Sequence, residues 1–144
     1  MSQKPDRVAY CPISQSLDVF GDKWSLLIIR EMTLFKKNTY GDFLKMEEKI
    51  ATNILADRLV NLEKAGIITK EVFAGSKSKF LYKLTHKGID LVPIIIELFS
   101  WGNKYFSIHP LLNDLSEKIK ADKDKFKRKL TAGLTTELTR YQSE

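Results

Sequence analysis

The sequence predicts a mostly helical chain that carries one small β-hairpin. Two observations support this fold class. Apolar residues recur at helical spacing over most of the 144 residues, and residues that favour helix ends separate these runs. Residues 67–84 differ, because two runs rich in β-branched and aromatic residues flank a turn of glycine, serine and lysine, which is the usual pattern of a hairpin.

Two helices are expected at the start of the chain. Pro12 is expected to begin the first helix, over residues 13–20. A proline fits at a helix start because the amide hydrogen that it lacks would have no partner there. Asp22 is the expected N-cap of the second helix, over residues 23–33. This second helix is apolar nearly all round, so it should be the buried central helix of the domain.

A short helix over residues 40–46, capped by Thr39, precedes a longer helix over residues 52–65. The longer helix has one apolar and one polar face, and Gly66 follows where a left-handed residue usually ends a helix. Two helices joined by a turn of a few residues form a helix-turn-helix pair. A polar-faced helix followed by a basic hairpin is how winged helix-turn-helix domains contact DNA, so this is the predicted architecture.

After the hairpin, Thr85 is expected to cap a long helix over residues 86–106. Its apolar stripe is broader than a small domain easily covers, and a second copy of the chain is the usual cover. The prediction is therefore a homodimer with dimerisation helices at both ends of the domain. The predicted interface consists of Ile13, Leu17, Ile89, Val92, Ile96, Phe99 and Trp101.

His109-Pro110 marks a predicted boundary. Residues 1–110 would form the DNA-binding and dimerisation domain, and residues 111–144 a C-terminal helical extension. The extension is amphipathic enough to pack on another element, but not apolar enough to form its own core. Its lysine-rich stretch, residues 118–129, is either a second DNA contact or a solvated helix face, and the interspersed acidic residues favour the solvated face.

Composition limits the possible functions. The formal charge of +6 and the pI of about 9.3 favour a polyanionic partner. With one cysteine there is no intramolecular disulfide or cysteine metal cluster, and neither His86 nor His109 stands at metal-ligand spacing. No common catalytic or nucleotide-binding motif is present, so we expect no enzyme, no cofactor and no metal. Without a membrane-spanning stretch or a signal-peptide pattern, the chain is expected in the cytoplasm.

The predicted DNA contacts lie on the polar face of the helix over residues 52–65, before the short helix and at the wing tip. Asparagine and threonine can reach base edges, and lysines suit phosphates, although the same residues could simply be solvated. Asp57 either accepts from a cytosine amine or positions a basic neighbour, and Arg58 is expected to form a structural ion pair, for example with Glu31. The predicted set is Thr39, Thr52, Asn53, Ala56, Asp57, Lys64, Lys77, Ser78 and Lys79.

Two roles are open for Cys11, that of a redox or electrophile sensor and that of a structural residue. Cysteines at helix starts or near cations gain thiolate character and can sense oxidants or electrophiles, and Cys11 precedes Pro12 at a predicted helix start. A lone cysteine is also commonly a small buried apolar residue. A thiol enzyme would need a base beside Cys11, and no recognisable dyad provides one.

An ordered set of short motifs carries a resemblance to a known family. The motifs are Cys11-Pro12, Gly21-Asp22-Lys23-Trp24, Tyr40-Gly41-Asp42-Phe43, Ile54-Leu55-Ala56-Asp57-Arg58-Leu59, Leu62-Glu63, Gly66-Ile67, Tyr82-Lys83-Leu84-Thr85 and Trp101-Gly102. With these, the chain resembles the HxlR-type winged helix-turn-helix transcriptional regulators of bacteria over about residues 11–101. The C-terminal extension has no counterpart in the pattern.

The resemblance implies a homodimer that binds operator DNA and regulates nearby genes, most simply as a repressor, with the first and last helices of the domain forming the dimer interface. Some members respond to oxidants or electrophiles through the cysteine that corresponds to Cys11, so a small-molecule or redox effector is expected. Many members have a serine N-cap where this chain has Ala51, so Thr52 is expected to supply the cap. The alternative function is a winged-helix module that binds another protein and no DNA.

Overall fold

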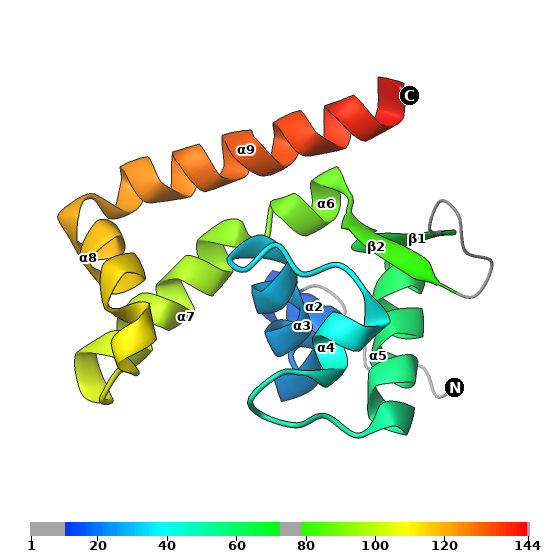
Figure 1. Cartoon of the computed structure of the whole chain (residues 1–144), viewed down its shortest axis with the longest axis horizontal. Coiled ribbons are helices and arrows are strands. Elements are labelled where there is room, and N and C mark those ends of the chain that lie inside the picture. Colours follow the sequence, from blue (N-terminus) through cyan, green and yellow to red (C-terminus); the bar gives the residue numbers. More distant parts are fainter. Residues whose placement is uncertain (1–10, 73–78, 144) are drawn as a thin grey trace.

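The computed structural model describes residues 11–72 and 79–143 and shows a mostly helical chain with one antiparallel hairpin (Figure 1). Its elements are α2 (Pro12–Phe20), α3 (Lys23–Thr33), α4 (Tyr40–Leu44), α5 (Thr52–Lys64), β1 (Ile68–Val72), β2 (Phe80–Leu84), α6 (His86–Ile89), α7 (Val92–Tyr105), η1 (Pro110–Leu112), α8 (Asn113–Ala121) and α9 (Lys123–Ser143). The predicted fold class is confirmed.

Helix α3 is the buried centre of the domain, as predicted. Ile28 and Ile29 are completely buried, and the helix contacts both α5 and α7. Its N-cap is Asp22, whose carboxylate accepts a hydrogen bond from the Ser25 amide at 2.9 Å. The next helices are therefore assembled on one rigid, apolar element.

Helices α4 and α5 form the helix-turn-helix pair. Thr39 and Asp42 form a reciprocal capping box at the start of α4, which ends at Leu44, two residues before the predicted end. The turn is fixed from outside the pair, because the Arg30 guanidinium donates to both carboxylate oxygens of Glu48 at 2.7 and 2.9 Å.

The start of α5 differs from the prediction. Its N-cap is Ala51, which has an extended backbone and no side-chain capping bond, and Thr52 is already the first helical residue. The prediction that Thr52 supplies the cap is wrong. At the other end, Gly66 has a φ of +78°, so a glycine ends α5 in the left-handed conformation that the sequence predicted.

Strands β1 and β2 pair antiparallel with Ile68 opposite Leu84 and Val72 opposite Phe80. The hairpin is attached to the helix-turn-helix pair on its β2 side. The Tyr82 amide donates to the Asn38 carbonyl at 2.8 Å just before α4. The predicted wing residues Lys77 and Ser78 lie outside the described residues.

The predicted long helix over residues 86–106 is two helices, α6 and α7, separated by Asp90 and Leu91. The break has a clear cause, because Pro93 has no amide hydrogen and its ring would clash with the carbonyl one turn earlier in a continuous helix. Helix α6 packs tightly on the hairpin: a Cβ on Gly88 would lie 2.3 Å from the Ile67 carbonyl oxygen. The single-helix prediction was therefore wrong.

Helix α7 packs against α3, α8 and α9 of the same chain, and this packing decides which of its sides faces solvent. Ile89, Val92 and Ile96 are only 2, 0 and 0% exposed within a single chain. Placing these three residues on a dimer surface was wrong, because they already form the core of the domain. The outer side of α7 instead exposes Ile94, Leu98, Trp101 and Tyr105.

The C-terminal helices pack against the rest of the chain. Helix α9 runs along α6 and α7 and ends close to the hairpin (Figure 1). Ile119 of α8 and Leu134 of α9 are buried in the same apolar core as the helix-turn-helix pair. Polar contacts add to this packing, since Lys123 of α9 pairs with Glu97 of α7 at 2.8 Å.

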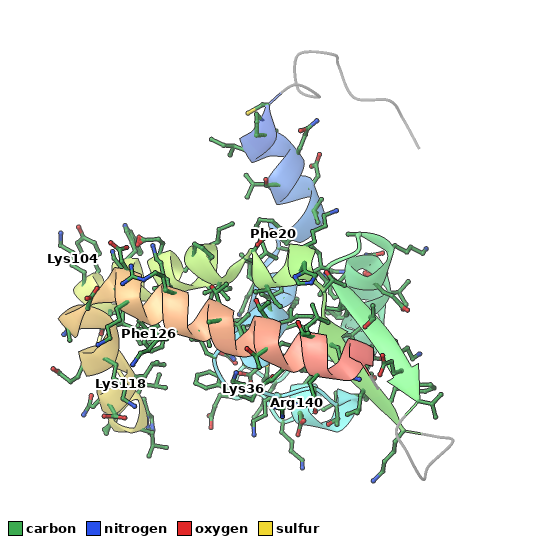
Figure 2. All side chains as sticks on the ribbon, turned by 90° about the horizontal axis from the view of Figure 1, so that it is seen from above. Phe20, Lys36, Lys104, Lys118, Phe126 and Arg140 are labelled. Atoms are coloured by element: carbon green, nitrogen blue, oxygen red, sulfur yellow. The ribbon has the colours of Figure 1, made fainter. Side chains whose placement is uncertain are left out.

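Helix α2 projects from the remainder of the molecule, and Phe20 at its base is buried (Figure 2). Ile13 and Leu17 on α2 are 70 and 57% exposed. No helix in the described part of the chain is both long and apolar enough to cross a membrane.

Candidate nucleic-acid interface

The outer face of α5 carries most of the predicted DNA contacts. Leu55, Leu59 and Leu62 fix its orientation, because they are at most 3% exposed and face the core. The opposite, solvent-exposed side therefore has a defined composition. It contains Thr52, Asn53, Ala56, Asp57 and Lys64, all predicted from the sequence.

Asp57 is held by neighbours on its own helix. It forms an ion pair with Arg58 and accepts a hydrogen bond from the side-chain Nδ2 of Asn61 at 3.2 Å. The expected pair between Arg58 and Glu31 is absent: Arg58 donates from Nε to Asp22 at 2.9 Å, whereas Arg30 lies 3.5 Å from Glu31. The sequence therefore predicted an ion pair correctly but named the wrong acid.

The Arg58–Asp22 pair joins the middle of α5 to the start of α3. Burial alone would raise the pKa of Asp22, but hydrogen bonds from Ser25 and Arg58, together with the Arg58 charge, outweigh burial and lower it. The carboxylate is thus charged at neutral pH. It orients α5 on the central helix while also capping that helix.

Thr39 and Tyr40 lie at the start of α4, beside α5. The Thr39 hydroxyl accepts from the Asp42 amide at 3.0 Å. The Tyr40 hydroxyl donates to the Thr52 carbonyl at 3.2 Å. These bonds bring the first turns of α4 and α5 together, so a contact from Thr39 to a DNA backbone would lie beside contacts from α5.

The hairpin adds lysines next to this surface. Lys79 is exposed just before β2, in agreement with its predicted place on the wing. Sequence reasoning missed Lys70 of β1, whose ammonium lies 4.1 Å from the centroid of the Phe80 ring. Side chains alternate along a strand, so Lys70 lies on the same face of β1 as buried Ile68 and as Val72, which pairs with Phe80. This alternation could have identified Lys70.

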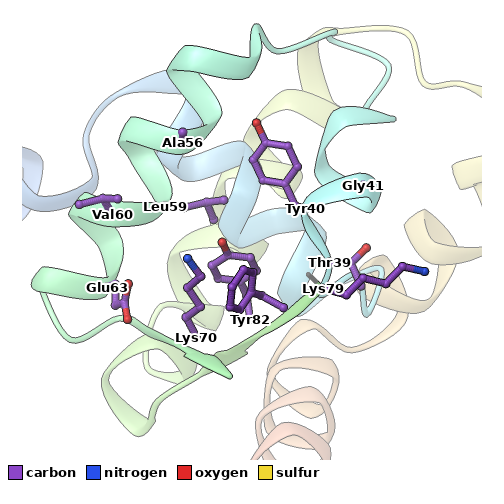
Figure 3. Close-up of a pocket in the computed structure, with 11 residues that line it drawn as sticks. Thr39, Tyr40, Gly41, Ala56, Leu59, Val60, Glu63, Lys70, Lys79 and Tyr82 are labelled. Carbon is purple, nitrogen blue, oxygen red and sulfur yellow. The ribbon is translucent and has the colours of Figure 1, made fainter. Parts of the chain in front are cut away.

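A hollow of about 510 Å³, which we call the wing pocket, lies between α4, α5 and the hairpin (Figure 3). Its lining is mostly apolar. Figure 3 shows Lys70 extending into the space between α5 and Tyr82, whereas the Lys79 side chain points away from it. The pocket is lined by Thr39, Tyr40, Gly41, Ala56, Leu59, Val60, Glu63, Lys70, Lys79, Phe80 and Tyr82.

Cys11 is the partly exposed N-cap residue of α2. The Ser14 amide, followed by the Ser14 hydroxyl and the Ile13 amide, lowers the pKa of the Cys11 thiol. These groups at the start of α2 therefore favour the thiolate form of Cys11, which a sensor of oxidants or electrophiles would require. His109 caps the short helix η1, because its Nδ1 accepts a hydrogen bond from the Leu111 amide at 3.1 Å. Among the described residues, no group of histidine, cysteine, aspartate or glutamate is arranged to hold a metal ion.

The fold and this surface define a winged helix-turn-helix protein. The model of the HxlR-like helix-turn-helix family matches residues 19–110, and the chain therefore belongs to this family of transcriptional regulators. Helices α8 and α9 lie beyond the matched region.

Individual relatives agree with this assignment. The chain is 35% identical to the uncharacterised HTH-type transcriptional regulator YdeP of Bacillus subtilis (strain 168), over 66% of this chain and 73% of YdeP. It is 39% identical to PA1607, whose crystal structure superposes with a TM-score of 0.62 over 71% of this chain and 70% of that protein. The redox regulator HypR in its oxidized form is 29% identical, with a TM-score of 0.61 over 68% of this chain and all (100%) of HypR. The relatives are thus named as regulators rather than as enzymes.

Proposed function

We propose that this protein is a dimeric, sequence-specific DNA-binding regulator that represses transcription from nearby promoters in the cytoplasm. The observation that carries the proposal is the exposed face of α5. Its apolar side is locked into the core, and Thr52 and Asn53 are exposed in its first turn. Later residues of the same helix, Ala56, Val60 and Glu63, line the wing pocket together with Lys70 and Lys79 of the basic hairpin. In this arrangement α5 enters the major groove, where Asn53 pairs with an adenine edge, and Lys79 meets a phosphate.

The dimer uses apolar surface that a single chain leaves uncovered. We assign to this interface Ile13 and Leu17 on the projecting helix α2, Trp101 on the outer side of α7, and half-buried Phe99 on α7. A twofold dimer presents two copies of α5, so the operator is a pseudo-palindrome with half-sites about one helical turn apart, or a close multiple.

Two substitutions test the DNA contacts, once sites have been selected from random duplexes by the full-length protein. Asn53→Ala should cost about 1–3 kcal/mol at one base position and relax the preference there. Lys79→Ala should weaken binding to all sequences and reduce the salt slope by about one unit. The matched controls are Asn113→Ala and Lys118→Ala. Both residues are exposed on α8, which follows the helix-turn-helix pair and the hairpin in the chain. If the Asn53 and Lys79 variants bind like their controls, α5 and the wing are not the DNA surface.

Cys11 is the proposed redox-sensing residue of this regulator. The lowered thiol pKa and the likeness to HypR support this role. Native Cys11 should be alkylated with a pH midpoint below the ordinary value of about 8.5, and its modification should change affinity for the selected DNA. Cys11→Ser should bind DNA and lose that response. Complete modification with unchanged affinity would remove the sensor and leave the DNA-binding proposal intact.

A further inference from the structure

The wing pocket has features that DNA binding does not require. Phosphates are charged and hydrated, and they bind well to exposed lysines and backbone amides. An apolar hollow beneath such a surface fits a different occupant. We propose that the wing pocket binds a flat aromatic monocarboxylate and that its occupation weakens DNA binding. Only the second half of this statement rests on the function proposed above.

The shape and lining of the pocket favour an aromatic molecule. Three rings line it, those of Tyr40, Phe80 and Tyr82, together with the aliphatic side chains of Leu59 and Val60. Aromatic rings gain energy beyond simple burial by stacking or edge-to-face contact with a second ring. The volume of about 510 Å³ lies within the range of about 300–1,000 Å³ that small-molecule sites occupy.

Charge within the pocket favours one carboxylate. Lys70 reaches into it and covers the Phe80 ring. Within the described residues no carboxylate forms an ion pair with Lys70, so its ammonium can pair with an incoming acid. Glu63 lines the same pocket from α5 and would repel a second carboxylate. A monoacid should therefore bind better than the corresponding diacid.

The walls of the pocket are preformed. The Tyr82 amide is bonded to the Asn38 carbonyl at 2.8 Å, and the Tyr82 ring packs on Phe43, with 5.9 Å between the two centroids. On the other side, the Ile67 amide donates to the Leu62 carbonyl at 3.0 Å, which sets β1 directly after α5. A ligand would therefore bind without having to order these elements, and this lowers the entropic cost of binding.

Occupation of the pocket would oppose DNA binding because the two sites share walls. Thr39, Ala56 and Lys79 are proposed DNA contacts and also line the pocket. A bound carboxylate would place a negative charge beside the path of the phosphates. It would also engage Lys70, one of the cations next to that path.

The first experiment measures ligand binding without DNA. Naphthoate is titrated into the full-length protein by calorimetry, alongside uncharged naphthol, non-aromatic cyclohexanecarboxylate and a naphthalene dicarboxylate. We expect naphthoate to bind with a Kd of about 1 mM or tighter and to bind at least about threefold more tightly than each of the other three. No naphthoate binding below about 5 mM, or equal binding of all four compounds, would overturn the proposal.

Variants then place the ligand. Val60→Trp fills the pocket from the exposed surface of α5 and should abolish binding, whereas Val19→Trp on α2 should not change it. Lys70→Gln keeps the shape and removes the charge, so naphthoate should bind about fivefold more weakly while naphthol is unaffected. Lys118→Gln is the matched lysine control. Naphthoate affinity unchanged in both pocket variants would show that the ligand binds elsewhere.

The last measurement concerns coupling to DNA. Naphthoate should reduce the affinity of the wild-type protein for its selected DNA, and Val60→Asn, which lowers the apolar character of the wall, should reduce this effect. If naphthoate binds in the pocket and the protein binds no DNA, the proposed function fails while the pocket stands. If both ligands bind simultaneously without mutual effect, the coupling is wrong.

Discussion

Helices α5 and α2 have similar amphipathic patterns but opposite surroundings. Leu55, Leu59 and Leu62 of α5 are buried by the chain itself, so only the polar side of that helix remains exposed. In α2 the apolar residues Ile13 and Leu17 are the exposed ones. The two helices show that an apolar stripe alone does not reveal its partner: one stripe builds the domain, and the other stays exposed on the described part of a single chain.

The largest expected effect sharpens this comparison on the α5 side. Leu62→Ala removes a fully buried side chain and should lower the free energy of unfolding by about 2–5 kcal/mol, because it leaves a cavity in the core. Val60→Ala on the same helix, where the side chain is 46% exposed, should cost less than about 1 kcal/mol. Denaturant unfolding of the two variants measures the difference. Equal losses would mean that α5 is not anchored as described.

The corresponding change on α2 should affect association more than folding. Leu17→Glu places a charge on the exposed apolar stripe and should raise the dimer dissociation constant at least about 100-fold, the equivalent of about 3 kcal/mol. Sedimentation over a range of concentrations measures this constant. Gln15→Glu adds the same charge on the other side of α2 and should leave association nearly unchanged. A wild-type protein that sediments as a monomer would refute the assignment of α2 to a dimer interface.

A smaller effect concerns a feature that the two helices share. Ala51 before α5 makes no side-chain capping bond, and Cys11 before α2 has a thiol in place of the oxygen acceptor that usually caps a helix. Ala51→Ser should therefore raise stability by about 0.5–1 kcal/mol, since a serine hydroxyl can accept from a free amide in the first turn. The same change at Ala56, within the helix, should be slightly destabilising. Thermal unfolding of the pair distinguishes a capping effect from a general effect of serine.

The smallest effect tests how α5 is oriented on α3. Asp22→Asn keeps an N-cap residue but removes the charge that pairs with Arg58, and the Asp22 side chain is 38% exposed, so the loss should be only about 0.2–1 kcal/mol at neutral pH. The direction in which the stability of the fold changes with pH follows from the lowered pKa of Asp22. The ionised group stabilises the fold above its unfolded pKa of about 3.9, and this contribution disappears as the pH falls through the folded pKa.

Wild type and Asp22→Asn should thus differ in stability near neutral pH and converge in acid. Urea unfolding at several pH values measures the two curves. Curves that stay parallel down to strongly acidic pH would show that the Asp22 charge contributes nothing to folding.

Local signals were predicted well from the sequence. Asp22, Thr39 and Thr85 cap helices as expected, and Gly66 ends α5, because each of these roles depends on a residue and its neighbours within one turn. The exposed polar face of α5 could also be predicted, because the spacing of its leucines determines which side of the helix is buried.

The errors arose where distant parts of the chain decide the outcome. The stripe of Ile89, Val92 and Ile96 looked too broad for one chain because the kink at Pro93 and the packing of α8 and α9 were not foreseen. Arg58 has several acids within reach in the sequence, and only the crossing of α5 over α3 selects Asp22. The wing pocket depends on three separate elements, so no local pattern could indicate it.

The position of α9 has a consequence for the order in which the chain folds. Lys36 lies 3.5 Å from Glu137, a residue 101 positions later, and Leu134 is buried against the same core that α3 organises. The helix-turn-helix pair and the hairpin precede α9 in the chain and are synthesised first, and their mutual contacts are much closer in sequence. We therefore expect the base of the hairpin to stay uncovered until α9 packs onto it, and Leu134 of α9 to complete the apolar core last.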